Sequence, residues 1–247
     1  MVGMDQRYAY YSELVGSVSA AIQRIQEMSQ ALCFNQRYIE LELIPKLGLN
    51  NEMLNEQPSE LNPFFGTGLH LWQYPNQFSK YLVWLAYNAR DIKSYMEIGC
   101  RWGGTFIIVM EWLKKIGCNL NFGVAVDPIP STPFIAEYVR LSSIPILYYQ
   151  GFSNSNDFKI YHSSSRPDMV FVDGDHTMFG VMNDHLLVRE TAKIIVHHDV
   201  VSDQCPDTTL FWSYVKNAES EFSYAEFLDQ YESVNGSFLG IGALRRK

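Results

Sequence analysis

Two short segments combine acidic side chains with histidines in an order that suits metal binding or proton transfer. Residues 172–176 have the sequence VDGDH, and residues 196–199 have the sequence VHHD. Each segment completes an apolar run of strand length, so in a parallel sheet both would end at one edge. The side chains that could converge there are Asp173, Asp175, His176, His198 and Asp199. Carboxylate and imidazole groups suit Mg²⁺, Mn²⁺ or a similar divalent ion. A hydrogen-bonded network without an ion is the alternative.

His176 is the residue of this set best suited to act as a general base. A hydroxyl group is a poor nucleophile until its proton is removed, and an imidazole titrates near neutral pH. A divalent ion beside it would lower the pKa of the hydroxyl and align it for reaction. The competing interpretation is that His176 only caps a helix beginning at Thr177.

A glycine-rich turn predicts a binding region near these acids. Residues 94–105, SYMEIGCRWGGT, place Glu97 at the end of an apolar run, and Gly99 and Gly103 follow it. In the dinucleotide fingerprint G-x-G-x-x-G, the second glycine lets the backbone meet a pyrophosphate, but Arg101 stands at that place here. We therefore expect a ligand with a cationic amino-acid end and no phosphate. Glycines that serve only to pack a strand–helix turn are the alternative.

Asp127 ends the next apolar run, FGVAVD. A carboxylate at the end of the second strand can accept hydrogen bonds from both hydroxyls of a ribose. An isolated aspartate there often only stabilises a turn. Together with the glycine turn, the pattern favours a ribose.

The elements that must position these residues alternate between strands and helices. Strands are expected at 95–98, 122–127, 145–150, 168–173 and 193–199, and helices at 104–116, 133–142, 154–161, 177–191 and 207–219. This alternation predicts an α/β fold with a Rossmann-like, doubly wound and mostly parallel sheet. The extended runs FSYAEFL and FLGIGALRR, joined through VNGS, predict a C-terminal antiparallel hairpin.

Residues 1–90 are predicted to form an N-terminal helical cap, and residues 91–247 the α/β domain. The cap is expected to contain helices over 10–32, over 35–44 up to Pro45, and from Pro75, with a loop over 50–68. These helices could serve as a lid over the site or as a homo-oligomer interface.

Composition excludes several classes of function. The chain has 247 residues and 47% hydrophobic residues, which fits one α/β domain with a helical extension. Its net charge of −8 argues against a nucleic-acid partner. Its apolar runs are too short for a signal peptide or a membrane span. The four cysteines are scattered without a CxxC pair, so we expect reduced thiols in a cytoplasmic protein.

The remaining histidines are expected to have other roles. His197 would point to the face of its strand opposite to His198, which predicts a structural role. His185 in mid-helix and His162 in a loop are expected at the surface. His70 lies in a long loop that could fold over a substrate.

The segments EIGCRWGGT, AVDP, VDGDH and VHHD together resemble the class I S-adenosylmethionine-dependent methyltransferases. The resemblance is closest to the group of macrocin-type sugar O-methyltransferases and cephalosporin-hydroxylase-like proteins, and it runs from about Trp72 to Trp212. It implies that Glu97, Gly99, Gly103 and Thr105 contact the methionine end of the cofactor, Asp127 its ribose and Ser153 its adenine.

The same resemblance assigns roles in the second region. In metal-dependent members, acids at the positions of Asp173 and Asp199 bind a divalent ion, and a histidine three residues after the first acid is the base, as His176 is here. His198 departs from the family, which has an acid or another oxygen ligand at that position. The metal set would then be Asp173, His198 and Asp199, with a softer ion or no ion as open alternatives.

These observations favour an S-adenosylmethionine-dependent O-methyltransferase that acts on a hydroxyl of a small molecule, such as a sugar or a glycosylated metabolite. His176 and Asp173 would form its catalytic pair. A non-catalytic protein that binds the cofactor is the second hypothesis. An NAD-dependent oxidoreductase is the third, and Arg101 in the glycine turn disfavours it.

Overall fold

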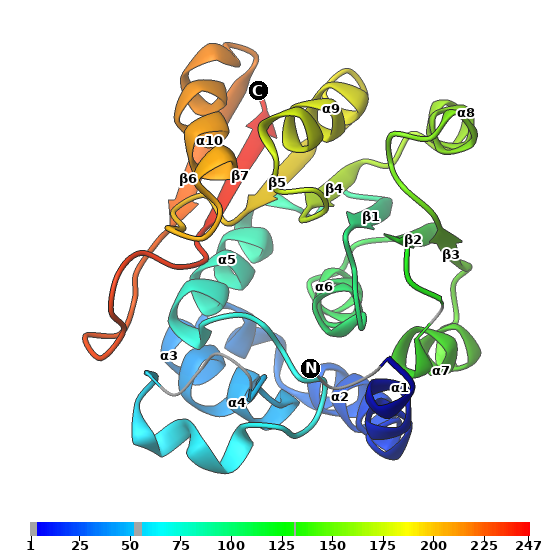
Figure 1. Cartoon of the computed structure of the whole chain (residues 1–247). Helices are drawn as coiled ribbons and strands as arrows, with labels where there is room; N and C mark the ends of the chain where they lie inside the picture. The colour runs from blue at the N-terminus through cyan, green and yellow to red at the C-terminus, as the bar shows by residue number, and fades with distance from the viewer. Residues whose placement is uncertain (1–3, 52–55, 131) are drawn as a thin grey trace.

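One mixed sheet of seven strands forms the centre of the molecule, as Figure 1 shows. The computed structural model describes residues 4–51, 56–130 and 132–247. The strands are β1 Ser94–Ile98, β2 Phe122–Asp127, β3 Ile146–Gln150, β4 Met169–Val172, β5 Ile194–His198, β6 Phe222–Phe227 and β7 Ile241–Arg246, in the spatial order β3-β2-β1-β4-β5-β7-β6. Strands β1 to β5 pair in parallel, and β7 runs antiparallel to both β5 and β6. The predicted mostly parallel Rossmann-like sheet with an antiparallel C-terminal pair is confirmed.

The strand order reverses between β1 and β4, and this reversal positions the site. From β1 the chain proceeds outward to β2 and β3, and it then returns to place β4 on the other side of β1. The loops that leave the carboxyl ends of β1 and β4 therefore separate to opposite faces. In open α/β sheets ligands bind in the crevice that this separation creates.

Helices cover both faces of the sheet, which explains why β1, β4 and β5 are buried along their whole length. One face packs against α5 (Pro75–Asn88), α6 (Gly104–Lys115) and α7 (Pro133–Leu141). The other packs against α8 (Asn156–Ser165), α9 (Met178–Val188) and α10 (Pro206–Ala218). The five helices predicted after residue 94 are all confirmed, with ends that differ by a few residues.

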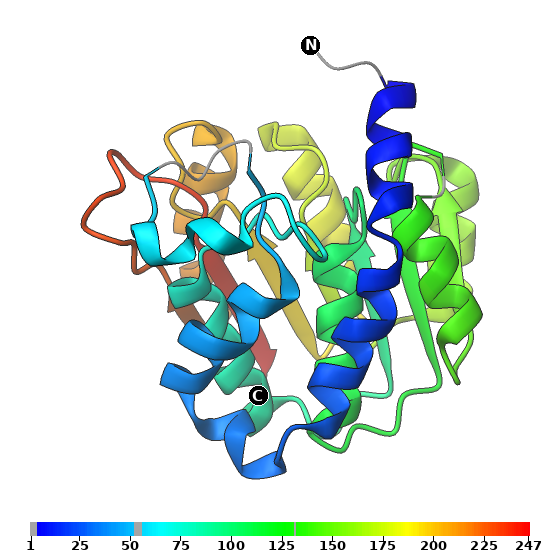
Figure 2. The same ribbon diagram turned by 90° about the horizontal axis from the view of Figure 1, so that it is seen from below.

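The N-terminal segment adds a layer outside α5, α6 and α7, visible in Figure 2. It contains α1 Met4–Glu13, α2 Gly16–Glu27, α3 Gln36–Tyr38 and α4 Ile44–Leu47, with 3₁₀ turns at Gln30–Phe34 and Ser59–Phe64 and a π turn at Ile39–Leu43. Helix α2 contacts α6, and α1 contacts α7. The division into a cap of residues 1–90 and a separate domain stays a prediction.

Three details of the predicted cap are wrong. The helix expected over 10–32 is interrupted by a turn at Leu14–Val15, just before Gly16. Pro45 does not end the second helix but lies in the first turn of α4, where its missing N–H is not needed. The loop expected over 50–68 contains the turn Ser59–Phe64, while residues 52–55 lie outside the described residues.

The connection between β6 and β7 is longer than the predicted VNGS turn. Strand β6 ends at Phe227 and β7 begins at Ile241. Leu239 and Gly240 both have positive φ angles, which turn the chain sharply before β7. Phe238 and Leu239 consequently line the cavity described below instead of extending the strand.

Among the described residues, no helix combines the length and the apolar character needed to cross a membrane.

Candidate active site

A cavity of about 510 Å³ lies at the carboxyl edge of the sheet, where β1, β2, β4 and β5 end. All ten residues predicted for the cofactor, the metal ion and catalysis line it: Glu97, Gly99, Gly103, Thr105, Asp127, Ser153, Asp173, His176, His198 and Asp199. The cavity has the size of an ordinary small-molecule site. Residues that stand up to about a hundred positions apart in the sequence thus share one wall, because parallel strands end at a common edge.

The glycine turn after β1 is required by close packing. Gly99 has a φ of +87°, and a Cβ added there would lie 1.9 Å from the carbonyl oxygen of Asp173. Gly103 has a φ of +88°, and its Cβ would lie 2.3 Å from Ile135 Cδ1. Packing therefore accounts for both glycines, as the alternative interpretation held. The case for a ligand must rest on the side chains that line the cavity.

Asp127 joins the glycine turn to the end of β2. The backbone N–H of Arg101 donates to its Oδ2 at 2.7 Å, and that of Ile129 donates to its Oδ1 at 3.0 Å. The carboxylate is 7% exposed and borders the cavity. Each carboxylate oxygen can accept a second hydrogen bond. Asp127 thus stabilises the turn and keeps acceptors for a ligand.

Glu97 is a buried acid at the end of β1. The Tyr95 hydroxyl donates to its Oε2 at 2.6 Å, and the residue is 2% exposed. Burial raises the pKa of Glu97 well above its ordinary value, despite the hydrogen bond from Tyr95. A cationic group bound beside it would favour the ionised carboxylate.

Sequence analysis missed Asp184, which faces the cavity from α9. Ser153 Oγ donates to its Oδ1 at 2.5 Å, and its Oδ2 is buried without a hydrogen-bond partner among the described residues. Burial raises the pKa of Asp184 to about 6. One signal in the sequence was available: Asp184 shares a helical face with Val181 and Val188, which are both buried.

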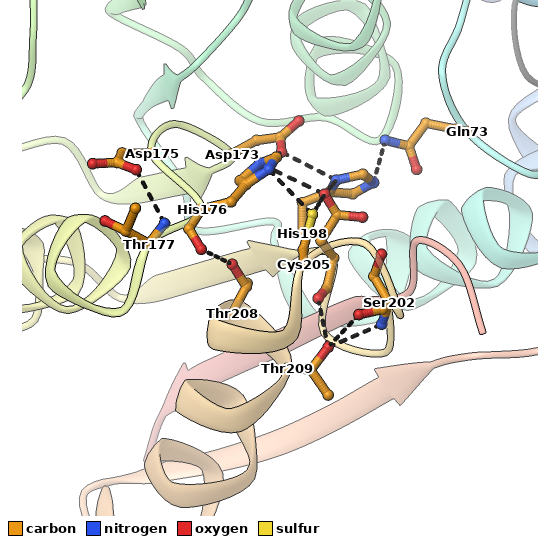
Figure 3. A network of polar contacts seen from close by, with 11 residues as sticks. Gln73, Asp173, Asp175, His176, Thr177, His198, Ser202, Cys205, Thr208 and Thr209 are labelled. Carbon is orange, nitrogen blue, oxygen red and sulfur yellow. Dashed lines mark hydrogen bonds and ion pairs between the residues drawn. The ribbon is translucent and has the colours of Figure 1, made fainter. Parts of the chain in front are cut away.

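The acids and histidines at the ends of β4 and β5 converge in the cluster drawn in Figure 3. Asp173 Oδ1 lies 3.2 Å from His176 Nε2 and 3.1 Å from His198 Nδ1. Asp199 Oδ2 lies 3.5 Å from His198 Nδ1 and 3.6 Å from His176 Nε2. Asp199 has a φ of +55°, which is uncommon for a residue other than glycine and occurs most often at functional sites.

The charges in this cluster stabilise one another. Burial acts to lower the pKa of His198, but Asp173 and Asp199 outweigh it, so this pKa lies well above the ordinary histidine value. Burial likewise acts to raise the pKa of Asp173, but His198 and His176 lower it below its ordinary range. The hydrogen bond to Asp173 raises the pKa of His176 against the effect of burial. Asp173 and Asp199 therefore favour the protonated form of the His198 ring that lies between them.

His176 does not cap the following helix. Thr177 performs that role, because its side chain accepts a hydrogen bond from the N–H of Gly180 and α9 begins at Met178. The Asp175 carboxylate accepts from the N–H of Thr177 and is turned away from Asp173 and His198, as Figure 3 shows. The His176 imidazole is 41% exposed and directed at Asp173, so a substrate can reach it.

Two further partners of the histidines were also missed. Gln73 Nε2 lies 2.9 Å from His198 Nε2, and the amide oxygen of Gln73 is buried with no hydrogen-bond partner in the described part of the chain. Cys205 Sγ lies 3.3 Å from His176 Nδ1 and 3.4 Å from Asp199 Oδ2. Burial, and secondarily Asp199, raise the pKa of Cys205 to about 12, which makes it a thiol. Both residues come from connecting segments whose approach to the site is set by the tertiary fold.

Two expectations about the other histidines are wrong. His185 is 2% exposed, because the buried face of α9 carries it against β5. His162 is 3% exposed and belongs to α8 rather than to a loop. His197 is fully buried on the face opposite to His198, as predicted. His70 lines the cavity from the loop before α5 and lies 3.0 Å from the Tyr11 hydroxyl.

Solved structures of other proteins are similar in fold to this chain. A protein from Streptococcus mutans described as a SAM-dependent methyltransferase matches 74% of this chain with a TM-score of 0.50 and 11% identity, over 52% of its own length. The MycE methyltransferase of the mycinamycin pathway, solved with Mg, SAH and mycinamycin VI, matches 72% of this chain with a TM-score of 0.45 and 15% identity, over 50% of its own length. The chain thus spans about half the length of both proteins.

No family model matches the sequence, and no curated protein sequence matches it. At these identities the structural likeness defines the fold and leaves the activity to the residues of the site. The chain therefore has the Rossmann-like fold of the class I S-adenosylmethionine-dependent methyltransferases.

Proposed function

We propose that the chain is an S-adenosylmethionine-dependent O-methyltransferase acting on a hydroxyl of a small molecule, a sugar or a glycosylated metabolite of the kind used by the macrocin-type group. One observation carries the proposal. The residues expected from sequence to hold the methyl donor and those expected to activate the acceptor line a single cavity at the carboxyl edge of the sheet.

The cavity residues fit the methyl donor. Besides Asp173 and Asp199, four side chains with carboxyl groups line the cavity: Glu97, Asp127, Asp175 and Asp184. Such a wall favours a ligand that carries cationic groups over a phosphorylated one. When bound, S-adenosylmethionine supplies a methyl group on a positively charged sulfur, and its transfer leaves a neutral thioether.

Each end of the donor has candidate partners in this cavity. Glu97, Gly99, Gly103 and Thr105 would hold its methionine end, and Asp127 its ribose. Ser153 and the unpartnered oxygen of Asp184 would face the adenine, whose amino group is a hydrogen-bond donor. These assignments predict loss of donor affinity on substitution of Asp127 or Asp184.

His176 would activate the acceptor. Its neutral imidazole takes the hydroxyl proton while the acceptor oxygen bonds to the methyl carbon, and the bond between methyl and sulfur breaks. Asp173, 3.2 Å from His176 Nε2, then stabilises the imidazolium and fixes the orientation of the ring. Because His176 is half exposed, its proton can pass to solvent after each turnover.

Asp173, His198 and Asp199 would hold Mg²⁺ or another divalent ion. The ligand atoms of these three residues lie within 4.8 Å of one another, and Asp199 Oδ1 is buried with no hydrogen-bond partner in residues 4–51, 56–130 and 132–247. The two ends of the Gln73 amide have nearly the same shape, so a half-turn would let its oxygen accept from His198 Nε2 and leave Nδ1 for the ion. The ion would lower the pKa of the acceptor hydroxyl.

The proposal is tested by donor binding followed by turnover. Thermal unfolding is measured with S-adenosylmethionine, with S-adenosylhomocysteine and with NAD, because only true ligands raise the midpoint by mass action. We expect stabilisation by the first two alone. Formation of S-adenosylhomocysteine is then measured over a panel of hydroxylated small molecules, with His176→Ala as the matched inactive control.

Each outcome is informative. Turnover that is lost in His176→Ala supports the methyltransferase with His176 as its base. Stabilisation without turnover on any acceptor would favour the non-catalytic binding protein. Stabilisation by NAD in place of the methyl donor would overturn the proposal. Turnover that is unchanged by a strong chelator would exclude the ion and leave the hydrogen-bonded network as the description of the cluster.

A further inference from the structure

Two overlapping sets of ligand atoms meet at Asp199. One is the set Asp173, His198 and Asp199, and the other consists of His176, Asp199 and Cys205. In each set one ligand atom per residue lies within 4.8 Å of the other two. The second set differs chemically, because it contains a sulfur atom and only one carboxylate. Mg²⁺ prefers oxygen ligands, whereas Zn²⁺ and Co²⁺ bind thiolate and imidazole well.

Two distances in the second set, both from the sulfur atom, fit a tetrahedral ion. Two atoms bound to one such ion at about 2.0–2.3 Å lie roughly 3.3–3.8 Å apart. Cys205 Sγ lies 3.3 Å from His176 Nδ1 and 3.4 Å from Asp199 Oδ2. Three protein ligands also leave a fourth position open for water.

Burial and access support the same site. Asp199 is 5% exposed, and its Oδ1 has no hydrogen-bond partner among the residues that the structure describes. This side chain therefore retains unused acceptor capacity beside the thiol. His176 and Cys205 both reach the surface in part, which provides a path for the ion. The other three cysteines are buried. Figure 3 shows the Cys205 sulfur directed toward the histidines of the cluster.

We propose that His176, Asp199 and Cys205 form a binding site for a thiophilic divalent ion such as Zn²⁺, and that occupation of this site inhibits methyl transfer. The inhibitory part rests on the proposed function. A neutral imidazole has one free lone pair, so an ion bound to His176 removes the base. Ion binding also displaces the thiol proton to solvent, and one proton is released for each ion bound.

The site is tested with Co²⁺ added to the metal-free full chain. We expect a thiolate-to-cobalt charge-transfer absorption band in the near ultraviolet, which Zn²⁺ abolishes and Mg²⁺ does not. Cys205→Ser should lose the band. Cys118→Ala is the matched control and should keep the band. Cys118 is buried, donates a hydrogen bond to the Ala89 carbonyl, and precedes β2 at the edge of the sheet opposite to the cavity. Cobalt binding without the band, or a band that survives in Cys205→Ser, would overturn the site.

A second measurement avoids the variant altogether. Saturating Zn²⁺ should protect Cys205 of the wild-type chain from alkylation, as read by peptide mass spectrometry, and equal labelling with and without Zn²⁺ would contradict the site. In the activity assay, Zn²⁺ should abolish methyl transfer and a chelator should restore it. Transfer that persists at saturating Zn²⁺ would overturn the inhibition. A chain that never transfers methyl groups would refute the proposed function, while the cobalt band would still decide the site.

Discussion

His197 and His198 are consecutive residues of β5, and their side chains enter two different environments. His198 points to the cavity, where its Nδ1 lies 3.1 Å from Asp173 Oδ1. His197 points to the opposite face of the sheet, where its Nε2 lies 3.1 Å from His185 Nδ1. The alternation of side chains along a strand thus separates a candidate reaction centre from a structural network.

The two environments shift the pKa of the histidine side chain in opposite directions. Burial and the neighbouring His185 lower the pKa of His197 well below the ordinary value, while Asp173 and Asp199 raise that of His198 against the same effect of burial. On that face of the sheet the His185 ring connects His197 to Glu219, because its Nδ1 lies 3.1 Å from His197 Nε2 and its Nε2 lies 3.1 Å from Glu219 Oε1. Identical side chains therefore hold structure together on one face and are available for chemistry on the other.

The largest expected effect is on the cavity side. Substitution His176→Ala should lower kcat by about 10²–10⁴, the usual contribution of a general base. Thermal unfolding should change little, because the His176 side chain is 41% exposed. Kinetics with saturating methyl donor, together with a melting curve, measure both. Full activity in this variant would remove His176 from the mechanism.

The substitution Asp184→Asn tests whether ionisation of the buried Asp184 side chain reduces the stability of the folded chain. The pKa of Asp184 is raised to about 6, so its ionised form is disfavoured in the folded chain. A raised carboxyl pKa gives stability that is complete below about pH 4 and is lost as pH rises through about 6. We expect the variant to be more stable than the wild type by up to about 3 kcal/mol at neutral pH, with no gain near pH 4.

Urea unfolding at the two pH values tests this prediction, and calorimetry tests whether the same variant binds the methyl donor more weakly. Ser153→Ala is the matched control, because it removes the hydrogen bond to Asp184 and leaves the acid in place. A stability gain that is the same at both pH values would show that ionisation of Asp184 is not its cause.

On the structural face, His185→Ala should destabilise the chain without changing the chemistry. It removes the ring that links His197 to Glu219 and leaves a buried imidazole without its partner. The expected loss is about 1–3 kcal/mol in the free energy of unfolding. The kcat of the folded fraction should match that of the wild type. A large loss of kcat with normal stability would contradict the assignment of a structural role to this face of the sheet.

The smallest expected effect is the pH dependence of the stability that His185→Ala loses. The pKa of His185 is lowered by burial, despite the opposing contribution of Glu219. The unfolded chain therefore binds more protons between the two pKa values, and the contribution of His185 is lost as pH falls below about 6.5. The difference in unfolding free energy between wild type and His185→Ala should shrink from pH about 7.5 to about 5.5. A difference that grows over this range would contradict the assignment.

The sequence was sufficient for the cavity because its residues follow strands directly. Asp127, Asp173 and Asp199 each stand where an apolar run ends, and parallel strands bring such positions together whatever the details of packing. The mostly parallel sheet and its antiparallel end were accessible for the same reason. The position of a strand and the point where it ends can be predicted from the local sequence pattern.

Residues that approach from helices and loops were not accessible in this way. Asp184 and His185 are neighbours in α9, and their burial depends on how α9 packs against β4 and α10. Gln73 and Cys205 reach the cluster from connecting segments, which no periodic pattern places. The length of the β6–β7 connection escaped prediction because the positive φ of Leu239, a residue that rarely adopts it, is imposed by the tertiary structure.

The central claim is that the cavity binds S-adenosylmethionine through the residues at the ends of β1 and β2. Calorimetric titration of the wild type and of Asp127→Asn tests it most directly, with melting curves to show that both are folded. The account predicts saturable one-site binding to the wild type and an affinity lower by roughly tenfold or more in the variant, the usual effect of losing a hydrogen bond to a charged group. Absence of binding to the wild type, or an unchanged affinity in Asp127→Asn, would contradict it.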